Sequence, residues 1–174
     1  MKDYQNEFRF HFPHEHRPAG RPMKTTPLTP ALAAEGAAFG TVNGWERMEY
    51  IKPTPDFHET YSFRFNEVFP LVAAEVDAVQ NAVGLTEVSG FNRYKLTGSG
   101  VHDFLDRMIC GRVTRKPGKV GLGYMLNHHG MLKGEATFAN LPDGRVWYGS
   151  AAAAEFHDMD WLQSHLRADE DVTI

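Results

Sequence analysis

Residues 124–138, which read Tyr124-Met-Leu-Asn-His-His-Gly-Met-Leu-Lys-Gly-Glu-Ala-Thr-Phe138, predict two β-strands joined by a tight turn. Tyr124 begins an apolar run, and Asn127-His-His-Gly130 has the composition of a turn in which the glycine can take a positive φ. After the turn, apolar or small residues alternate with Lys133, Glu135 and Thr137, which is the period-2 pattern of a half-buried strand. Glu135 therefore lies in mid-strand, beside a glycine that leaves room above the sheet. Taken alone, the position of Glu135 favours a solvent-exposed face over a functional site, because Glu is rarely buried without a partner.

Outward from this hairpin, residues 69–174 carry further helix and strand signals. Apolar residues at helical spacing predict a helix from about Phe69 to Gly84, and similar patterns predict helices over about 101–109 and 152–166. Strands are predicted at 85–88, 93–97, 122–126, 133–139, 145–149 and 171–174. Because helices and strands do not alternate strictly, the expected fold class is α+β, with a mostly antiparallel sheet and packed helices.

Residues 1–60 differ in composition and are rich in Pro and Gly. Thr29 to Gly36 predicts one short helix, with Thr29 as its N-cap and Pro30 suited to its first turn. The rest of this segment is expected to be extended and to need something to pack on. Lys52-Pro-Thr-Pro-Asp56 has the composition of a linker, so two segments are predicted, 1–60 and 61–174.

The bulk composition narrows the classes of function. A net charge of −4 and a pI of about 6.1 give no electrostatic argument for a nucleic acid or an anionic membrane as partner. Cys110 is the single cysteine, which rules out an internal disulfide, and its place after an apolar pair predicts a buried small residue. The chain begins without the apolar core of a secretory signal, and no apolar stretch has the length of a membrane span. A cytoplasmic protein is therefore expected.

Several motifs together resemble a known family. Four stretches are similar, in order and spacing, to the first part of the folate-binding domain of the glycine-cleavage T-protein (aminomethyltransferase): residues 84–98, Val101-His-Asp-Phe-Leu-Asp-Arg-Met108, the turn at 127–135, and Asp158-Met-Asp-Trp-Leu162. Upstream, Arg17-Pro-Ala-Gly-Arg-Pro22 and Gly44-Trp-Glu-Arg47 resemble the region that joins the flavin domain to the folate domain in sarcosine and dimethylglycine dehydrogenases. The resemblance covers nearly the whole chain. It implies that residues 1–60 are the connecting segment and that 61–174 are the N-terminal part of the folate-binding domain.

The resemblance also implies a folate site around the hairpin. Glu135 falls where the family has an aspartate that contacts the folate amine carrying the one-carbon unit, and Gly134 falls where it usually has a second aspartate. Methylene transfer passes through an iminium cation, which a nearby carboxylate stabilises and whose amine proton it can hold or relay. The other folate contacts implied by the resemblance are Leu122, Tyr124, Met125, Asn127 and Ala151. Ala151 begins a run of four alanines that could instead pack the start of a helix, and both interpretations stay open.

Metal and nucleotide sites are not predicted. His11, His14 and His16 cluster around a proline, and two more histidines lie in the turn, but they lack the regular spacing and further ligands of a zinc site. Surface histidines are therefore favoured. No Gly-x-Gly-x-x-Gly fingerprint follows a predicted strand, so FAD is expected only through a domain that these residues do not supply.

The function implied by the resemblance is the folate side of an FAD-dependent sarcosine- or dimethylglycine-type dehydrogenase. In such enzymes a flavin oxidises an N-methyl group and tetrahydrofolate captures the carbon. The partners implied are a flavin domain or subunit and the remaining lobes of the folate domain, so the chain alone is expected to be inactive. The alternative is a non-catalytic fragment or interaction module that docks on a separate flavin or folate-binding subunit.

Overall fold

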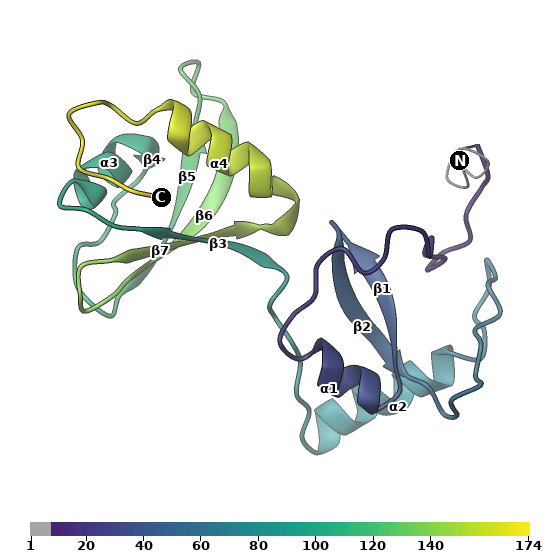
Figure 1. Cartoon of the computed structure of the whole chain (residues 1–174). Helices are drawn as coiled ribbons and strands as arrows, with labels where there is room; N and C mark the ends of the chain where they lie inside the picture. Colours follow the sequence, from purple (N-terminus) through teal and green to yellow (C-terminus); the bar gives the residue numbers. More distant parts are fainter. Residues whose placement is uncertain (1–7) are drawn as a thin grey trace. The chain divides into compact units, whose positions relative to one another are not determined.

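The computed structural model describes residues 8–174, which form two compact units divided between Ser89 and Gly90 (Figure 1). The change of composition near residue 60 predicted an earlier boundary. The structure instead keeps the helix that begins at Phe69 within the first unit. The roles assigned above to segments 1–60 and 61–174 stay predictions.

The first unit holds a short helix, a hairpin and a longer helix: α1 (Thr29–Ala34), β1 (Ala37–Val42), β2 (Trp45–Ile51) and α2 (Phe69–Asn81). Both helices were predicted. Pro30 lies in the first turn of α1, where no backbone N–H is needed, but Leu28 rather than Thr29 is its N-cap residue. The pairing of β1 with β2 was not predicted. Its two-residue turn is Asn43-Gly44, and both residues have positive φ (52° and 81°), as a type I′ turn requires.

A charged pair, more than an apolar core, holds the hairpin to the preceding chain. Arg21 Nη2 lies 2.5 Å from Glu46 Oε2 and also donates a hydrogen bond to the Phe39 carbonyl at 2.7 Å. The hydrogen bond from Arg21 lowers the pKa of the buried Glu46 carboxyl below its ordinary value. Residues 8–28 form no helix or strand of their own, in agreement with the predicted extended segment.

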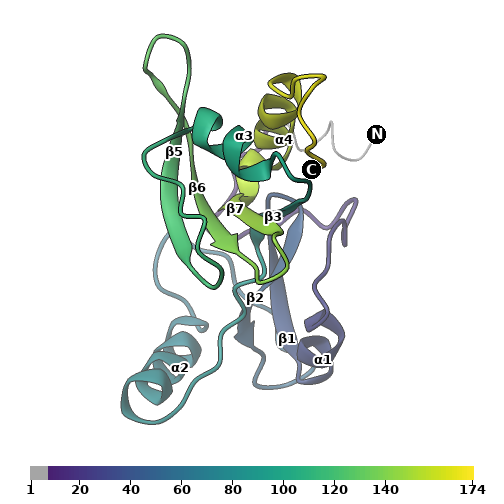
Figure 2. The ribbon, with the colours of Figure 1, turned by 90° about the vertical axis from the view of Figure 1, so that its left-hand side faces the viewer.

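The second unit is an antiparallel sheet with helices over one face. The strands are β3 (Phe91–Leu96), β4 (Ile109–Cys110), β5 (Val120–Leu126), β6 (Leu132–Asn140) and β7 (Val146–Ala151), in the order β3-β7-β6-β5-β4. Helices α3 (Val101–Met108) and α4 (Glu155–Ser164), the latter preceded by the 3₁₀ turn η2 (Ala152–Ala154), lie on the same side of this sheet (Figure 2). Their apolar residues form one core with the inward-facing residues of the strands, including Phe104, Leu105, Phe138, Tyr148 and Leu162.

This architecture confirms the α+β class and the mostly antiparallel sheet. The predicted strand at 85–88 is wrong: Leu85 is 98% exposed, and no described strand lies beside this segment to complete a hydrogen-bond ladder. The predicted strand at 171–174 is reduced to one bridge between Thr97 and Thr173. Within residues 8–174, no helix combines the length and the apolar character that crossing a membrane demands.

Candidate functional site

One face of the five-stranded sheet is left open by the helices. In β3, β5 and β7, buried residues alternate with exposed or half-buried ones, and the buried set belongs to the core under α3 and α4. The open face carries the large apolar side chains Phe91, Val120, Leu122, Tyr124 and Trp147, and, on β3, the exposed basic residues Arg93 and Lys95. Uncovered apolar side chains of this kind are typical of a binding surface.

Glu135 lies on this open face, in the middle of β6. It is paired directly with Tyr124 of β5, and both side chains are exposed. The next pair on the same face is Leu122 with Thr137, and Thr137 pairs in turn with Gly149 of β7. Continuing that register by two residues brings Ala151 level with Glu135. The structure therefore brings together four of the predicted site residues: Leu122, Tyr124, Glu135 and Ala151.

The other two predicted contacts lie elsewhere. Met125 is on the covered face with 0% exposure, and its sulfur lies 3.6 Å from the Tyr148 hydroxyl oxygen. Asn127 caps the β5–β6 turn, where its Oδ1 accepts hydrogen bonds from the backbone N–H groups of His129 and Met131, both at 2.9 Å. The side chain of Met125 thus packs in the core, and the side-chain oxygen of Asn127 is used by the turn.

Two glycines of the sheet differ in the face on which they leave room. A Cβ at Gly134 would lie 3.1 Å from Met125 Cε and 3.5 Å from Asp158 Oδ1, so Gly134 leaves room on the core side and not above the sheet. Gly149 is the glycine of the open face, because a Cβ there would meet only backbone oxygens at 3.6 and 3.8 Å. The sequence reasoning missed Gly149 and Thr137, although the period-2 pattern of 146–151 was enough to place Gly149 beside Ala151 on one face.

Cys110 corrects a further expectation. It was predicted to be buried, but it is exposed and pairs with Tyr124 at the edge of the sheet. The preceding residue, Ile109, takes the core position instead. In a two-residue strand only one side chain can face the core, because successive side chains point to opposite faces.

A buried polar group supports the site from beneath. Asp158 of α4 is buried, accepts a hydrogen bond from the Tyr148 hydroxyl at 3.1 Å, and lies 2.9 Å from His157 Nδ1. Burial and the nearby Asp158 carboxylate raise the pKa of Tyr148, so its hydroxyl keeps its proton and remains a donor. Tyr148 lies in β7 and Asp158 in α4, so this bond ties the helix to the strand that carries Gly149 and Ala151.

The chemistry available on the open face combines the Glu135 carboxylate with exposed apolar side chains and, on β3, the basic residues Arg93 and Lys95. Glu135 makes no hydrogen bond or ion pair with any residue in the described part of the chain. Small residues beside it allow a flat ring to approach the strands, and the free carboxylate can attract a positively charged nitrogen. Among residues 8–174, no three His, Cys, Asp or Glu side chains are grouped so as to hold a metal ion.

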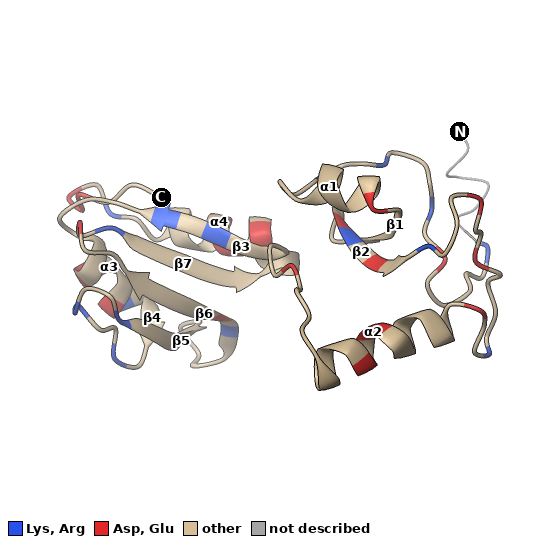
Figure 3. Cartoon of the chain, turned by 90° about the horizontal axis from the view of Figure 1, so that it is seen from below, with Lys and Arg blue, Asp and Glu red and all other residues tan. Residues whose placement is uncertain are grey.

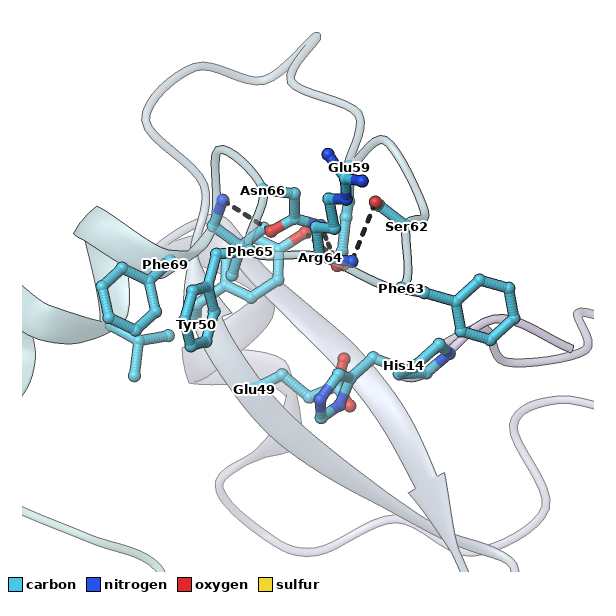
Figure 4. A pocket seen from close by; sticks show the side chains of 13 residues that line it. His14, Glu49, Tyr50, Glu59, Ser62, Phe63, Arg64, Phe65, Asn66 and Phe69 are labelled. Atoms are coloured by element: carbon cyan, nitrogen blue, oxygen red, sulfur yellow. Dashed lines mark hydrogen bonds between the residues drawn. The ribbon is translucent and has the colours of Figure 1, made fainter.

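A pocket that the sequence did not predict lies in the first unit. Its volume is about 740 Å³, and four aromatic rings from Tyr50, Phe63, Phe65 and Phe69 contribute to its walls (Figure 4). Its carboxylates already have partners: Glu59 accepts a hydrogen bond from Asn66 Nδ2 at 2.8 Å, and Glu49 lies 2.8 Å from His16 Nε2. This pocket is therefore predominantly an apolar surface.

The fold and this arrangement define an α+β domain in which one face of the sheet is covered and the other presents a carboxylate. The family model described as the GCVT N-terminal domain matches residues 28–174, and the chain belongs to that family. The chain is 28% identical over 165 residues to mitochondrial dimethylglycine dehydrogenase from Rattus norvegicus, which covers 94% of this chain and 19% of that protein. It is 27% identical over 165 residues to mitochondrial sarcosine dehydrogenase from Homo sapiens, covering 80% of this chain and 18% of that protein.

A solved structure supports the fold. The glycine cleavage system aminomethyltransferase T from Bartonella henselae aligns with 86% of this chain at a TM-score of 0.60 and 19% identity, and the alignment covers 37% of that protein. The resemblance inferred from the motifs is thus confirmed for the family and the fold. The chain spans about one fifth of the length of the dehydrogenases that it matches.

Proposed function

We propose that this chain forms part of the folate side of an N-methyl amine dehydrogenase, with the open face of the second unit as its tetrahydrofolate surface. The observation that carries the proposal is the grouping of Leu122, Tyr124, Glu135 and Ala151 on one uncovered face. Two of the similar proteins, dimethylglycine dehydrogenase and sarcosine dehydrogenase, support the class of reaction.

The residues present fit a reduced folate. A pterin or aryl ring is flat and needs a shallow apolar floor, which Leu122, Gly149 and Ala151 offer. The amine that carries the one-carbon unit needs an anion at its edge, and Glu135 is the acid on that floor with no partner among the described residues. The ring of Tyr124, paired with Glu135 across the strands, is placed to flank the same ligand.

Tetrahydrofolate, when bound, supplies the nitrogen that accepts the one-carbon unit. The Glu135 carboxylate stabilises the positive charge that develops on the reacting amine, and it can take up the amine proton. In the exposed setting of this chain, water screens the carboxylate and weakens that effect. Further polypeptide that excludes water from the open face would strengthen it, which is why the chain alone is proposed to bind weakly and to need partners. FAD belongs, in this proposal, to one of those partners.

The test is a binding experiment on the full chain with tetrahydrofolate, followed by NMR. We expect millimolar binding with shifts at Leu122, Glu135 and Ala151. The variant Glu135→Gln should weaken affinity by up to about fivefold, because a solvent-exposed charge pair is worth about 0.2–1 kcal/mol. Asp160→Asn, an exposed acid on α4, is the matched control and should leave affinity unchanged.

Two results would reject the proposal. The first is a set of shifts that maps to the pocket of the first unit instead of to β5, β6 and β7. The second is equal affinity for the wild-type chain and Glu135→Gln, which would return Glu135 to the role of a solvated surface acid.

A further inference from the structure

Helix α2 buries none of its residues among the described part of the chain. Even so, one side of it is apolar at helical spacing: Phe69, Val72, Val76 and Val79, continued by Val83 beyond its end. All five of these side chains are exposed. A surface helix normally buries such a stripe, because packing of the apolar face supplies most of its stability.

The rest of the first unit also buries few apolar residues. Its buried apolar residues, among those described, are Ala37 and Tyr50, whereas the core of the second unit contains fourteen. Ordering a chain costs about 1–2 kcal/mol per residue in backbone entropy, and apolar burial is the main term that offsets this cost. The first unit therefore requires additional apolar cover.

The exposed stripe continues into the pocket of the first unit. The rings of Phe65 and Phe69 lie 4.3 Å apart, and Phe69 and Val72 belong both to α2 and to the pocket lining. Figure 4 shows Phe65, Phe69 and Tyr50 close together at one end of the pocket. We call this continuous surface the α2 patch: Phe65, Phe69, Val72, Val76, Val79 and Val83.

Along the sequence, the charged residues that flank the α2 patch are mostly acidic. Between residues 56 and 87 there is a single basic residue, Arg64, and six acids: Asp56, Glu59, Glu67, Glu75, Asp77 and Glu87. Figure 3 shows acidic and no basic positions on α2 itself. A second copy of the same patch would bring like charges together, which disfavours self-association. The complementary surface is apolar in the middle and bordered by Lys and Arg.

We propose that the α2 patch is the docking surface for the polypeptide that completes this enzyme. That polypeptide corresponds to the part of an aminomethyltransferase-type protein lying outside the region that this chain matches, and it meets the patch with an apolar face bordered by basic residues. Lengths support this occupant, because the chain covers 37% of the solved aminomethyltransferase and 19% of dimethylglycine dehydrogenase. The inference rests on the proposed function only in requiring that such a polypeptide be present.

The test is site-specific photo-cross-linking. The full chain carries p-benzoylphenylalanine in place of Val79 and is expressed in its source organism, and the cross-linked peptides are identified by mass spectrometry. We expect peptides from a polypeptide that matches the remaining aminomethyltransferase region. Val42, beside the Asn43-Gly44 turn of the first unit, is the control position, because it is also an exposed valine (53%, against 63% for Val79) and lies outside the α2 patch. It should give at least tenfold less of that product.

A second substitution in the chain that carries the cross-linker tests whether the acidic residues near the α2 patch contribute to docking. Asp77→Lys should lower the yield of the Val79 cross-link about threefold, as expected for one surface charge pair. Asp160→Lys on α4 should leave the yield unchanged. Three outcomes would overturn the proposal: a cross-link to α2 of a second copy, a cross-link to residues 90–174 of the same chain, or none at all. Unchanged tetrahydrofolate affinity in Glu135→Gln, together with an intact cross-link, would reject the proposed function but leave this docking surface in place.

Discussion

Two glycine-to-alanine substitutions test which face of the five-stranded sheet is buried, on which the candidate site depends. Gly123 of β5 lies on the covered face, where a Cβ would overlap Ile109 Cγ2 and lie 3.2 Å from Phe138 Cε2. Gly149 of β7 lies on the open face, where a Cβ would make ordinary contacts only. Neither glycine has a positive φ, so alanine suits both backbones.

The magnitudes follow from these contacts. Ile109 is buried and branched at Cβ, so it cannot turn away freely, and forcing a methyl group against it should cost about 1–3 kcal/mol. Gly149→Ala should be neutral or stabilise the unit by up to about 1 kcal/mol, because alanine restricts the unfolded chain. For a unit of this size, 1 kcal/mol shifts the melting temperature by about 4–8 °C, so Gly123→Ala should melt at least about 4 °C lower than wild type.

The assay must report on the second unit alone. Hydrogen exchange measured by mass spectrometry on peptides from 120–151, at increasing urea, gives the free energy of unfolding for these strands. The reasoning is refuted if Gly149→Ala destabilises the strands as much as Gly123→Ala does. The two faces would then be wrongly assigned, and Leu122, Tyr124 and Glu135 would no longer share an open surface.

Two further outcomes are expected. Tyr148→Phe removes the hydrogen bond to the buried Asp158 carboxylate and should lower the free energy of unfolding by about 1.5–3 kcal/mol in the same exchange assay; an unchanged value would show that the bond is not formed. Glu170 accepts hydrogen bonds from Arg107, which hold its pKa below the ordinary value of 4.5. Because the folded-state pKa is the lower one, this contribution to stability is complete above pH 4.5 and is lost as the pH falls through the folded value. Melting temperatures measured from pH 6 to pH 3 should therefore decline less steeply for Glu170→Gln than for wild type, and parallel curves would contradict the assignment.

Local patterns predicted much of the second unit, and the reasons are visible in particular residues. The alternation along 132–138 identified β6 and put Glu135 on the face opposite Ala136 and Phe138. The helix at 101–108 followed from apolar residues that do face the core. The strand predicted at 85–88 failed because a strand exists only where a neighbour completes its hydrogen bonds, and a short apolar run carries no information about neighbours.

The first unit was predicted less well, because local patterns do not show which segments pair or which surfaces are covered. Asn43-Gly44 is a typical hairpin-turn dipeptide, but the proline-rich composition around it favours extended structure. The apolar stripe of α2 was recognised as a helix pattern, yet the pattern implied burial that the described residues do not provide. Periodicity reports which side of a helix is apolar, and it does not report what covers that side.

The sequence by itself determined the local chemistry of this protein: the turn at Asn127 and Gly130, the alternation that carries Glu135, the family to which the motifs belong, and the acidic character around α2. These features depend on residues within a few positions of one another. Only the tertiary structure decided that α3 and α4 cover the same face of the sheet, that Met125 belongs to the core, and that Ala151 comes level with Glu135 and Tyr124. Those results depend on the register between strands and on which face of the sheet the helices cover. No single stretch of sequence specifies either of these.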